Sequence, residues 1–321
     1  MDTSLAIKRF DPEAENAKPY WQEFSLNLEQ SATVLDALIM IREEIDGSLA
    51  LRCSCRSAIC GSCAMRVNGK AVLACKTRIE NVSDNSRPIS IEPAGIMPVI
   101  KDLVVDMDLF WNKVKEITPW LETEGVEPKE EYIASNESMV NLASVMNCIM
   151  CGACVSDCTV LEVDPAFIGP AALAKAYRFV GDPRDSKNKE RLEVLDQYSG
   201  IWDCTRCMEC VEVCPKDVAP MDRIMELREK AIQTGFNKTT GAKHAEAFTK
   251  IIEHSGSLDE LKLPIKTFGI LNMPLNMLPV GLRAAAKGKM PPVIHPSIPE
   301  VEKVKRIFDK FEEEEIENQE E

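Results

Sequence analysis

Twelve of the thirteen cysteines of this 321-residue chain fall into three groups of four. The first group reads C-x4-C-x2-C-x11-C, and the other two read C-x2-C-x2-C-x3-C. The first spacing is that of plant-type [2Fe–2S] proteins, and the second is that of two-cluster ferredoxins. Three such groups in series predict a chain of three electron-carrying clusters. The groups are Cys55, Cys60, Cys63 and Cys75; Cys148, Cys151, Cys154 and Cys158; and Cys204, Cys207, Cys210 and Cys214.

The main alternative for the first group is a zinc site in a turn-rich loop. Zinc sites usually pair C-x2-C knuckles, and the spacing of this group fits that arrangement poorly. The loop from Arg52 to Cys63 is also rich in serine, alanine and glycine. Small residues let the backbone come close enough to donate N–H groups to thiolate and sulfide sulfur. Spacing and composition together favour a [2Fe–2S] cluster.

The second and third groups predict two clusters with crossed ligands. In two-cluster ferredoxins the fourth cysteine of each run binds the other cluster. Because this crossing joins the two halves of the domain, we expect the apo-protein to be largely unfolded there. The predicted ligands are Cys148, Cys151, Cys154 and Cys214 for a [4Fe–4S] cluster, and Cys158, Cys204, Cys207 and Cys210 for the third cluster.

Cys53 is the remaining cysteine, two residues before Cys55. We interpret it as a small, partly buried side chain. The alternative is a spare ligand or a redox-sensitive thiol near the first cluster.

The composition is that of a globular protein, with 45% hydrophobic residues and a formal net charge of −14. This charge argues against nucleic acid, whose phosphates require a basic surface. We expect no membrane-spanning helix, because the most apolar stretch, 268–282, is broken by Pro274 and Pro279. The first residues do not resemble a secretory signal, and thiolate ligands suit a reducing cytoplasm. The glutamate-rich end, 312–321, is interpreted as a solvated or frayed tail.

The periodicity predicts an α+β chain in three segments. Residues 1–105 form a β-grasp plant-type [2Fe–2S] ferredoxin domain, 106–235 an all-α bacterial-type two-cluster domain, and 236–321 a C-terminal helical extension with an acidic tail. The first segment should hold one helix, capped by Ser31, and a tight turn at Asn68-Gly69. Its strands are expected at 6–10, 23–28, 64–67, 71–74 and 89–91, the last closing the sheet. Helices are expected from Met107 onward, along 139–146, and at Pro170 and Pro220, both in the favoured first position.

Three stretches resemble the iron–sulfur subunit of succinate dehydrogenase and fumarate reductase. They are SCRSAICGSCAM at 54–65, FIGPAALAKAYRF at 167–179 and CVEVCPK at 210–216. The resemblance covers about residues 5–235 and includes the order of the two ferredoxin domains. It implies a subunit that relays electrons between the FAD of a flavoprotein, which interconverts succinate and fumarate, and a membrane-associated subunit on the quinone side. It also implies a peripheral place on the cytoplasmic side of the inner or cell membrane, held by partner subunits, and substrate chemistry on the partner.

Two departures from that family concern the third cluster. The usual member has no cysteine at the position of Cys207 and therefore holds a [3Fe–4S] cluster on Cys158, Cys204 and Cys210. Here the additional thiolate indicates a [4Fe–4S] cluster, with [3Fe–4S] as the alternative. The usual quinone pocket also takes Pro-Ser-x-Trp and a histidine, where this chain has Thr-Val-Leu-Glu at 159–162 and Thr205. Quinone is therefore not expected to bind this subunit in the common way.

The segment 236–321 is similar to the C-terminal part of small iron–sulfur subunits of heterodisulfide reductases, which dock onto a cysteine-rich CCG-domain subunit. Non-classical, E-type succinate dehydrogenases use such a partner in place of a cytochrome b anchor. The segment and both departures therefore favour a CCG-domain partner. The alternative function is the iron–sulfur subunit of a thiol-linked fumarate reductase or a heterodisulfide-reductase-like complex. A redox sensor or a structural metal protein is a weaker hypothesis, since a sensor needs one labile cluster rather than three.

Other residues offer little chemistry. His244, His254 and His295 lie far from every cysteine group in the sequence, so surface or packing roles are expected. No G-x-G-x-x-G motif for a flavin or nicotinamide occurs, and no nucleophilic constellation is present. The stretch 272–278 with Arg283, Lys287 and Lys289 is interpreted as a loop packed on the ferredoxin domain, with an amphipathic contact to a membrane or partner as the alternative.

Overall fold

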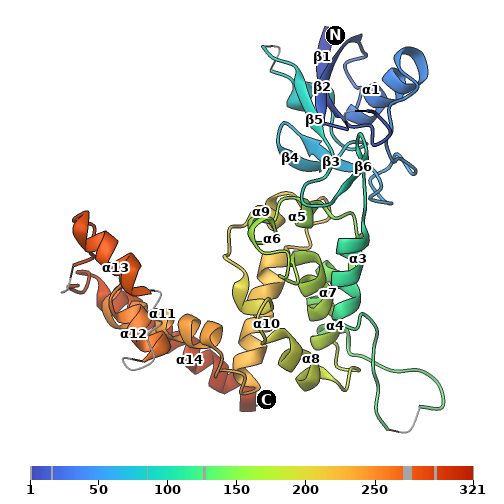
Figure 1. Cartoon of the computed structure of the whole chain (residues 1–321). Helices are drawn as coiled ribbons and strands as arrows, with labels where there is room; N and C mark the ends of the chain where they lie inside the picture. Colours follow the sequence, from blue (N-terminus) through green and yellow to red (C-terminus); the bar gives the residue numbers. More distant parts are fainter. Residues whose placement is uncertain are drawn as a thin grey trace. The chain divides into compact units, whose positions relative to one another are not determined.

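The computed structural model of the chain describes residues 2–15, 17–84, 86–125, 128–269, 277–292 and 295–320. The chain separates into two compact units, Met1–Ala231 and Ile232–Glu321 (Figure 1). The first unit contains every cysteine.

Five strands of the first unit form one mixed sheet in the order β2-β1-β5-β3-β4 (Figure 1). β1 pairs antiparallel with β2 and parallel with β5, and β5 pairs antiparallel with β3. Helix α1 buries Val34 and Leu38 in the same core as Leu5 and Ile91, which confirms the β-grasp fold. The elements are β1 (Asp2–Arg9), β2 (Tyr20–Asn27), α1 (Val34–Met40), a π-helical turn (Ile41–Ile45), β3 (Ala64–Val67), β4 (Lys70–Leu73), α2 (Ile79–Val82), β5 (Ile89–Glu92), β6 (Val99–Lys101) and β7 (Val104–Val105).

Two local predictions in this domain are wrong. The cap of α1 is Thr33 and not Ser31, because Thr33 Oγ1 accepts from the N–H of Asp36 while the Asp36 carboxylate accepts from the N–H of Thr33. This reciprocal pair satisfies two end groups of the helix at once. The strand at 89–91 does not close the sheet. As β5 it lies between β1 and β3, where Ile89 and Ile91 are buried.

The hairpin of β3 and β4 positions two cysteines of the first group. Asn68 and Gly69 have φ of 50° and 81°, as the predicted two-residue turn requires. Cys63 directly precedes β3, and Cys75 follows β4 by two residues. The N–H of Ala74 also donates to the carbonyl of Cys63. The hairpin therefore brings together two cysteines of the first group that are twelve positions apart in the sequence.

The rest of the first unit is a helical bundle. Helices α7 and α10 begin at Pro170 and Pro220, and α3 begins directly after Met107, as predicted. Leu173 of α7 and Leu142 of α4 are fully buried, so these helices form the core behind the cysteine loops. The elements are α3 (Asp108–Glu116), α4 (Asn136–Met146), α5 (Ala153–Ser156), α6 (Thr159–Val163), α7 (Pro170–Val180), α8 (Asn188–Leu195), a 3-10 turn (Ile201–Asp203), α9 (Glu209–Glu212) and α10 (Pro220–Gln233).

The second unit is helical, with α11 (Thr240–Ser255), α12 (Lys262–Phe268), α13 (Met277–Ala286) and α14 (Val301–Glu320). Helix α11 ends at Gly256, whose φ of 73° is that of a left-handed cap. The glutamate-rich end is not a frayed tail, because α14 continues to Glu320.

His295 Nε2 lies 3.4 Å from the Glu260 carboxylate. Residues 272–276 lie outside the described residues, and no helix in the described ranges has the length and apolar character of a membrane span.

Candidate functional site

The loop that begins at Cys55 directs its backbone N–H groups at cysteine sulfur. N–H donors to sulfur stabilise a thiolate and tune the potential of a cluster bound there. Five N–H···S hydrogen bonds of 3.3–3.5 Å are formed, from Ser57, Ile59 and Cys60 to Cys55, from Ala58 to Cys75, and from Cys55 to Cys60.

This loop reaches its conformation through backbone strain. Arg56 and Ala58 have φ of 53° and 55°. Such left-handed angles cost a non-glycine residue on the order of 1–3 kcal/mol and persist only where the surrounding structure enforces them. The strain turns successive N–H groups toward the sulfur atoms, so the loop fits a group that carries negative charge on sulfur.

The thiols of the first group differ in pKa. Hydrogen bonds, first from the N–H of Cys55 and then from Ser62, lower the pKa of Cys60 to about 6. Burial raises the pKa of Cys63 to about 12. Metal ligands must be deprotonated, so binding of iron by both would release a proton from Cys63.

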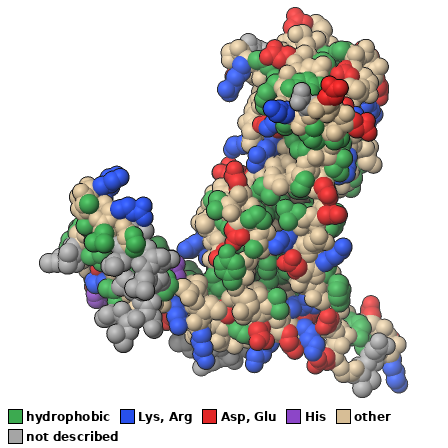
Figure 2. Space-filling model, in the orientation of Figure 1, with side chains coloured by type: hydrophobic (Ala, Val, Ile, Leu, Met, Phe, Trp, Pro, Cys, Tyr) green, Lys and Arg blue, Asp and Glu red, His purple; other side chains and the backbone are tan. Residues whose placement is uncertain are grey.

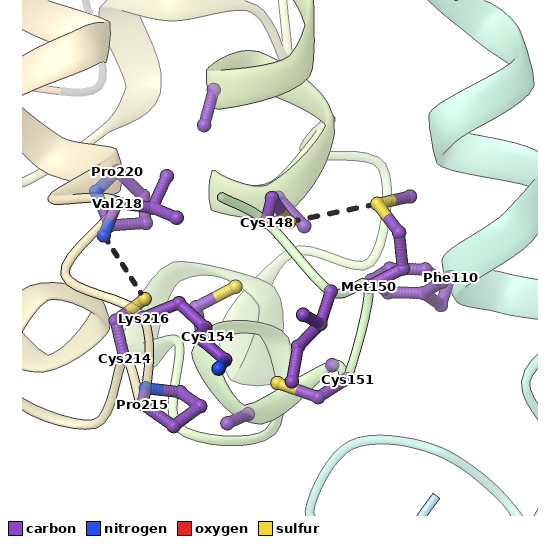
Figure 3. A pocket seen from close by; sticks show the side chains of 15 residues that line it. Phe110, Cys148, Met150, Cys151, Cys154, Cys214, Pro215, Lys216, Val218 and Pro220 are labelled. Carbon is purple, nitrogen blue, oxygen red and sulfur yellow. Dashed lines mark hydrogen bonds between the residues drawn. The ribbon is translucent and has the colours of Figure 1, made fainter. Parts of the chain in front are cut away.

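Cys148, Cys151, Cys154 and Cys214 line one pocket of the first unit (Figure 3). The first three come from the run that leads into α5, whereas Cys214 follows α9. The N–H of Val218 donates to Cys214 Sγ at 3.4 Å. Burial, and then the charges of Cys148 and Cys214, raise the pKa of Cys151 to about 11. The structure thus brings together the four residues predicted for the second cluster, and their role as ligands stays a prediction.

The four cysteines predicted for the third cluster, Cys158, Cys204, Cys207 and Cys210, also lie close to one another. Burial, and then the charges of the three other thiols, raise the pKa of Cys210 to about 12. The hydroxyl of Thr159 donates to Cys207 Sγ at 3.4 Å, which links the two cysteine runs. Cys158 and Cys210 are buried, and Cys207 is exposed. Across the described ranges, no three His, Cys, Asp or Glu side chains converge at the distance that suits a single metal ion.

The two cysteine runs of the bundle share one backbone conformation. In each run, the residue just before the second cysteine and the residue just after it have positive φ. Each run then leads into a short helix, α5 or α9. Cys207 therefore occupies in its run the place that Cys151 occupies in the other. The φ angles are 55° at Met150 and 57° at Arg206, and 78° at Gly152 and 69° at Met208.

Arg228 of α10 supports the loop that carries Cys204. Its Nε donates to the carbonyl of Ile201 at 2.8 Å, and its Nη2 donates to those of Trp202 and Cys204 at 3.0 and 2.8 Å. Its guanidinium also lies 5.4 Å from the Trp202 ring centroid, a cation–π distance. The sequence analysis missed Arg228, because nothing in its local spacing connects it to a cysteine.

Polar contacts join the β-grasp domain to the bundle. Arg66 of β3 donates from Nε to Asp157 Oδ1 at 2.8 Å and from Nη2 to the carbonyl of Ser156 at 2.6 Å. Asp157 Oδ2 accepts from the N–H of Ala71 at 2.7 Å, and Ser156 Oγ accepts from the N–H of Gly95 at 2.8 Å. Asp157 is largely buried, so this ion pair is shielded from water. The sequence analysis missed these residues as well.

Beside these contacts the first and second cysteine groups meet. A Cβ added to Gly61, which lies between Cys60 and Cys63, would stand 2.8 Å from Cys151 Cβ and 2.9 Å from its Cα. Only a residue without a side chain permits this approach. The first two groups are therefore neighbours, in the order that the sequence predicts.

Comparisons with known proteins agree with this organisation. Residues 4–112 match the family described as a 2Fe-2S iron-sulfur cluster binding domain, and residues 144–218 match a 4Fe-4S dicluster domain. A succinate dehydrogenase iron-sulfur subunit from Coxiella burnetii (strain RSA 493 / Nine Mile phase I) is 37% identical over 233 residues, which are 72% of this chain and 97% of the relative. The chain belongs to the family of succinate dehydrogenase iron–sulfur subunits.

A solved structure supports the fold of this iron–sulfur subunit. A chain of the "Mycobacterium smegmatis Sdh1 complex in the apo form" matches with a TM-score of 0.67 and 23% identity, covering 74% of this chain and 98% of that chain. The predicted fold class is thus confirmed, a [2Fe–2S] domain followed by a helical dicluster domain. The [2Fe–2S] and [4Fe–4S] cofactors of this oxidoreductase subunit are confirmed by the matched families.

The close approach at Gly61 leads to a testable prediction for this iron–sulfur subunit. Gly61→Ala should lower the free energy of unfolding of the holo-protein by ~1–3 kcal/mol more than Gly69→Ala does, because overpacking adds to backbone strain. It should also weaken the magnetic interaction between the reduced first and second clusters, since the two loops must move apart. Guanidinium unfolding and EPR spectroscopy measure these two effects.

Gly69→Ala is a matched control, because Gly69 also has a positive φ, 81°, but nothing lies within 4 Å of an added Cβ. Equal effects of the two substitutions would show that the contact with Cys151 has no energetic consequence.

Proposed function

We propose that this chain relays electrons, one at a time, between the FAD of a flavoprotein subunit and a membrane-associated subunit on the quinone side of a succinate dehydrogenase or fumarate reductase. The observation that carries the proposal is the contact of the first two cysteine groups at Gly61 and Cys151. When bound, the clusters supply one-electron redox chemistry. The chain's own residues would hold the first two next to each other and donate N–H hydrogen bonds to sulfur.

The proposed ligands follow the three groups that the fold assembles. The [2Fe–2S] cluster takes Cys55, Cys60, Cys63 and Cys75, and the first [4Fe–4S] cluster takes Cys148, Cys151, Cys154 and Cys214. The third cluster takes Cys158, Cys204, Cys207 and Cys210 as a second [4Fe–4S] cluster, with [3Fe–4S] as the alternative. The matching backbone of the two runs supports this assignment, because Cys207 and Cys151 occupy equivalent places.

The proposed partner on the membrane side is a CCG-domain cysteine-rich subunit, with a cytochrome b anchor as the alternative. By the resemblance, Thr-Val-Leu-Glu at 159–162 and Thr205 stand where the usual quinone pocket has Pro-Ser-x-Trp and a histidine. The hydroxyl and indole donors that would hold a quinone carbonyl are therefore missing, which supports this choice. Family membership implies a complex peripheral to a membrane, and we propose its cytoplasmic side. We propose three functional domains. Residues 1–105 carry the [2Fe–2S] cluster on the flavoprotein side, residues 106–235 carry the two other clusters, and residues 236–321 form the C-terminal extension.

The thiol-linked fumarate reductase or heterodisulfide-reductase-like alternative is not favoured by the comparisons, because the matched relative is a succinate dehydrogenase subunit. This alternative would be supported if the complex were active with thiols in place of quinols.

The decisive experiment uses the anaerobically purified complex of this chain with its partners. Succinate should reduce an artificial dye through the flavoprotein and should also reduce the [2Fe–2S] centre of this chain within the turnover time, as followed by EPR in rapidly frozen samples. A complex that neither oxidises succinate nor reduces fumarate would contradict the proposed function.

A further inference from the structure

The second unit contains a long stretch without acidic residues. Residues 261–299 include no aspartate or glutamate, although the chain has 52 acidic residues and a net charge of −14. The stretch is therefore a local positive region in an acidic protein. Its basic residues are Lys262, Lys266, Arg283, Lys287 and Lys289.

Helix α13 and the residues after it expose apolar side chains among these cations. Arg283 is the only charged residue of Met277–Ala286. Leu282 is 63% exposed and Met290 is 48% exposed. Arg283, Lys287 and Lys289 are exposed as well. A helix of this apolar composition is usually buried. The exposure of its C-terminal half, where Leu282, Ala285 and Ala286 are all exposed, therefore indicates a surface that contacts a membrane or another molecule.

The spacing places the two kinds of side chain next to each other. Leu282 and Ala286 are four residues apart and share one face of α13. Arg283 lies next to Leu282 in the helix, and Lys287 directly follows the helix, where its N–H donates to the carbonyl of Arg283 at 3.2 Å. Two other lysines of this unit pair with carboxylates, since Lys250 pairs with Glu246 and Lys262, at the start of the stretch, pairs with Asp259. Figure 2 shows Lys and Arg side chains beside hydrophobic ones at the end of this unit where Figure 1 labels α13.

We propose that Met277–Pro292 binds the anionic headgroup surface of a membrane. An apolar helix face bordered by cations is the arrangement of helices that lie in the interface, with the apolar side at the acyl boundary and the cations among lipid phosphates. Helix α13 cannot cross the bilayer, because its 10 residues rise only about 15 Å against a hydrocarbon core of about 30 Å. The segment is thus an interfacial anchor that this chain itself contributes, in addition to any membrane-side partner subunit.

The charge of the segment favours lipid over a protein partner as its occupant. A segment with three cations and no carboxylate among residues 277–292 complements a continuous sheet of phosphate groups, and each cation near the sheet contributes roughly a fivefold gain in binding. The inference goes beyond the relay function, because electron transfer within the first unit does not require α13.

The test is vesicle flotation of the intact complex. Vesicles of phosphatidylcholine mixed with phosphatidylglycerol should bind the complex, and vesicles of phosphatidylcholine alone should bind it weakly. The triple variant R283Q/K287Q/K289Q should lose on the order of 100-fold in partition coefficient, and binding of the unaltered complex should fall as salt is raised. Leu282→Ser should weaken binding in a way that salt does not change.

A control variant, K238Q/K243Q/K250Q, makes the same change in net charge at exposed lysines on or just before α11 and should bind vesicles as the unaltered complex does. Cluster absorbance and succinate-linked dye reduction report the relay separately, and all variants should retain both. Equal vesicle binding by the triple variant and the unaltered complex would overturn the proposal. So would loss of a partner subunit from the triple variant with vesicle binding unchanged, which would identify the segment as a protein interface.

Discussion

Replacing Cys214 with serine is expected to remove the second cluster and to leave the third in place. Cys214 lines the same pocket as Cys148, Cys151 and Cys154, although it lies in the other cysteine run. A serine hydroxyl is a far weaker ligand for iron than a thiolate, and the free energy of metal binding at such sites contributes to the free energy of folding. The variant should therefore lose one [4Fe–4S] EPR signal and electron transfer from the flavin, and its bundle should unfold at lower denaturant concentration.

Cys53→Ser is the control for this substitution. Cys53 packs against the core of the β-grasp domain and lies in none of the three groups, so all clusters and the relay should survive its replacement. Loss of the third cluster rather than the second in the Cys214 variant would mean that each run binds its own cluster and that the ligands do not cross.

Replacing Cys207 with serine is expected to convert the third cluster from [4Fe–4S] to [3Fe–4S]. The other ligands of that group would still hold three irons, whereas the fourth iron would lose its thiolate. Because cluster type and charge set the potential, the midpoint potential of the third cluster should rise. EPR of the oxidised variant should show a [3Fe–4S] signal that is absent from the unaltered complex, and a redox titration measures the change in potential.

Thr159→Val provides the matched control. It removes only the hydroxyl that donates to Cys207 Sγ at 3.4 Å, so the cluster should stay [4Fe–4S] with a small change in potential. A strong [3Fe–4S] signal in the unaltered, anaerobically purified complex would show that Cys207 is not a ligand.

The turn and the helix starts that the sequence predicted correctly depend on the chemistry of neighbouring residues. Asn68-Gly69 produced the predicted turn because both residues accept positive φ, and Pro170 and Pro220 began helices because proline suits the first helical position. The cap of α1 was misassigned because two candidate hydroxyls lie two residues apart. Only Thr33 has an acidic residue three positions later that can return the hydrogen bond.

Other features had no local signal. The position of β5 at the centre of the sheet depends on pairing with β1, which is 80 or more residues away in the sequence. Arg228, Arg66 and Asp157 look like ordinary surface charges in the sequence. Each acquires its role only when the fold brings a distant backbone carbonyl, ion-pair partner or N–H group within hydrogen-bonding distance.

By itself the sequence determined the kinds of iron–sulfur domain, their order and the family, because cysteine spacing is a local property and few spacings suit an iron–sulfur cluster. It left the packing between groups open. Only the tertiary structure decided that Gly61 touches Cys151 and that the C-terminal half of α13 is exposed. It also brings Cys214 to the pocket of Cys148, as the crossed spacing predicts. Contacts of this kind depend on the closure of long loops and on the shape of the surfaces that meet, and neither is encoded in any short stretch of residues.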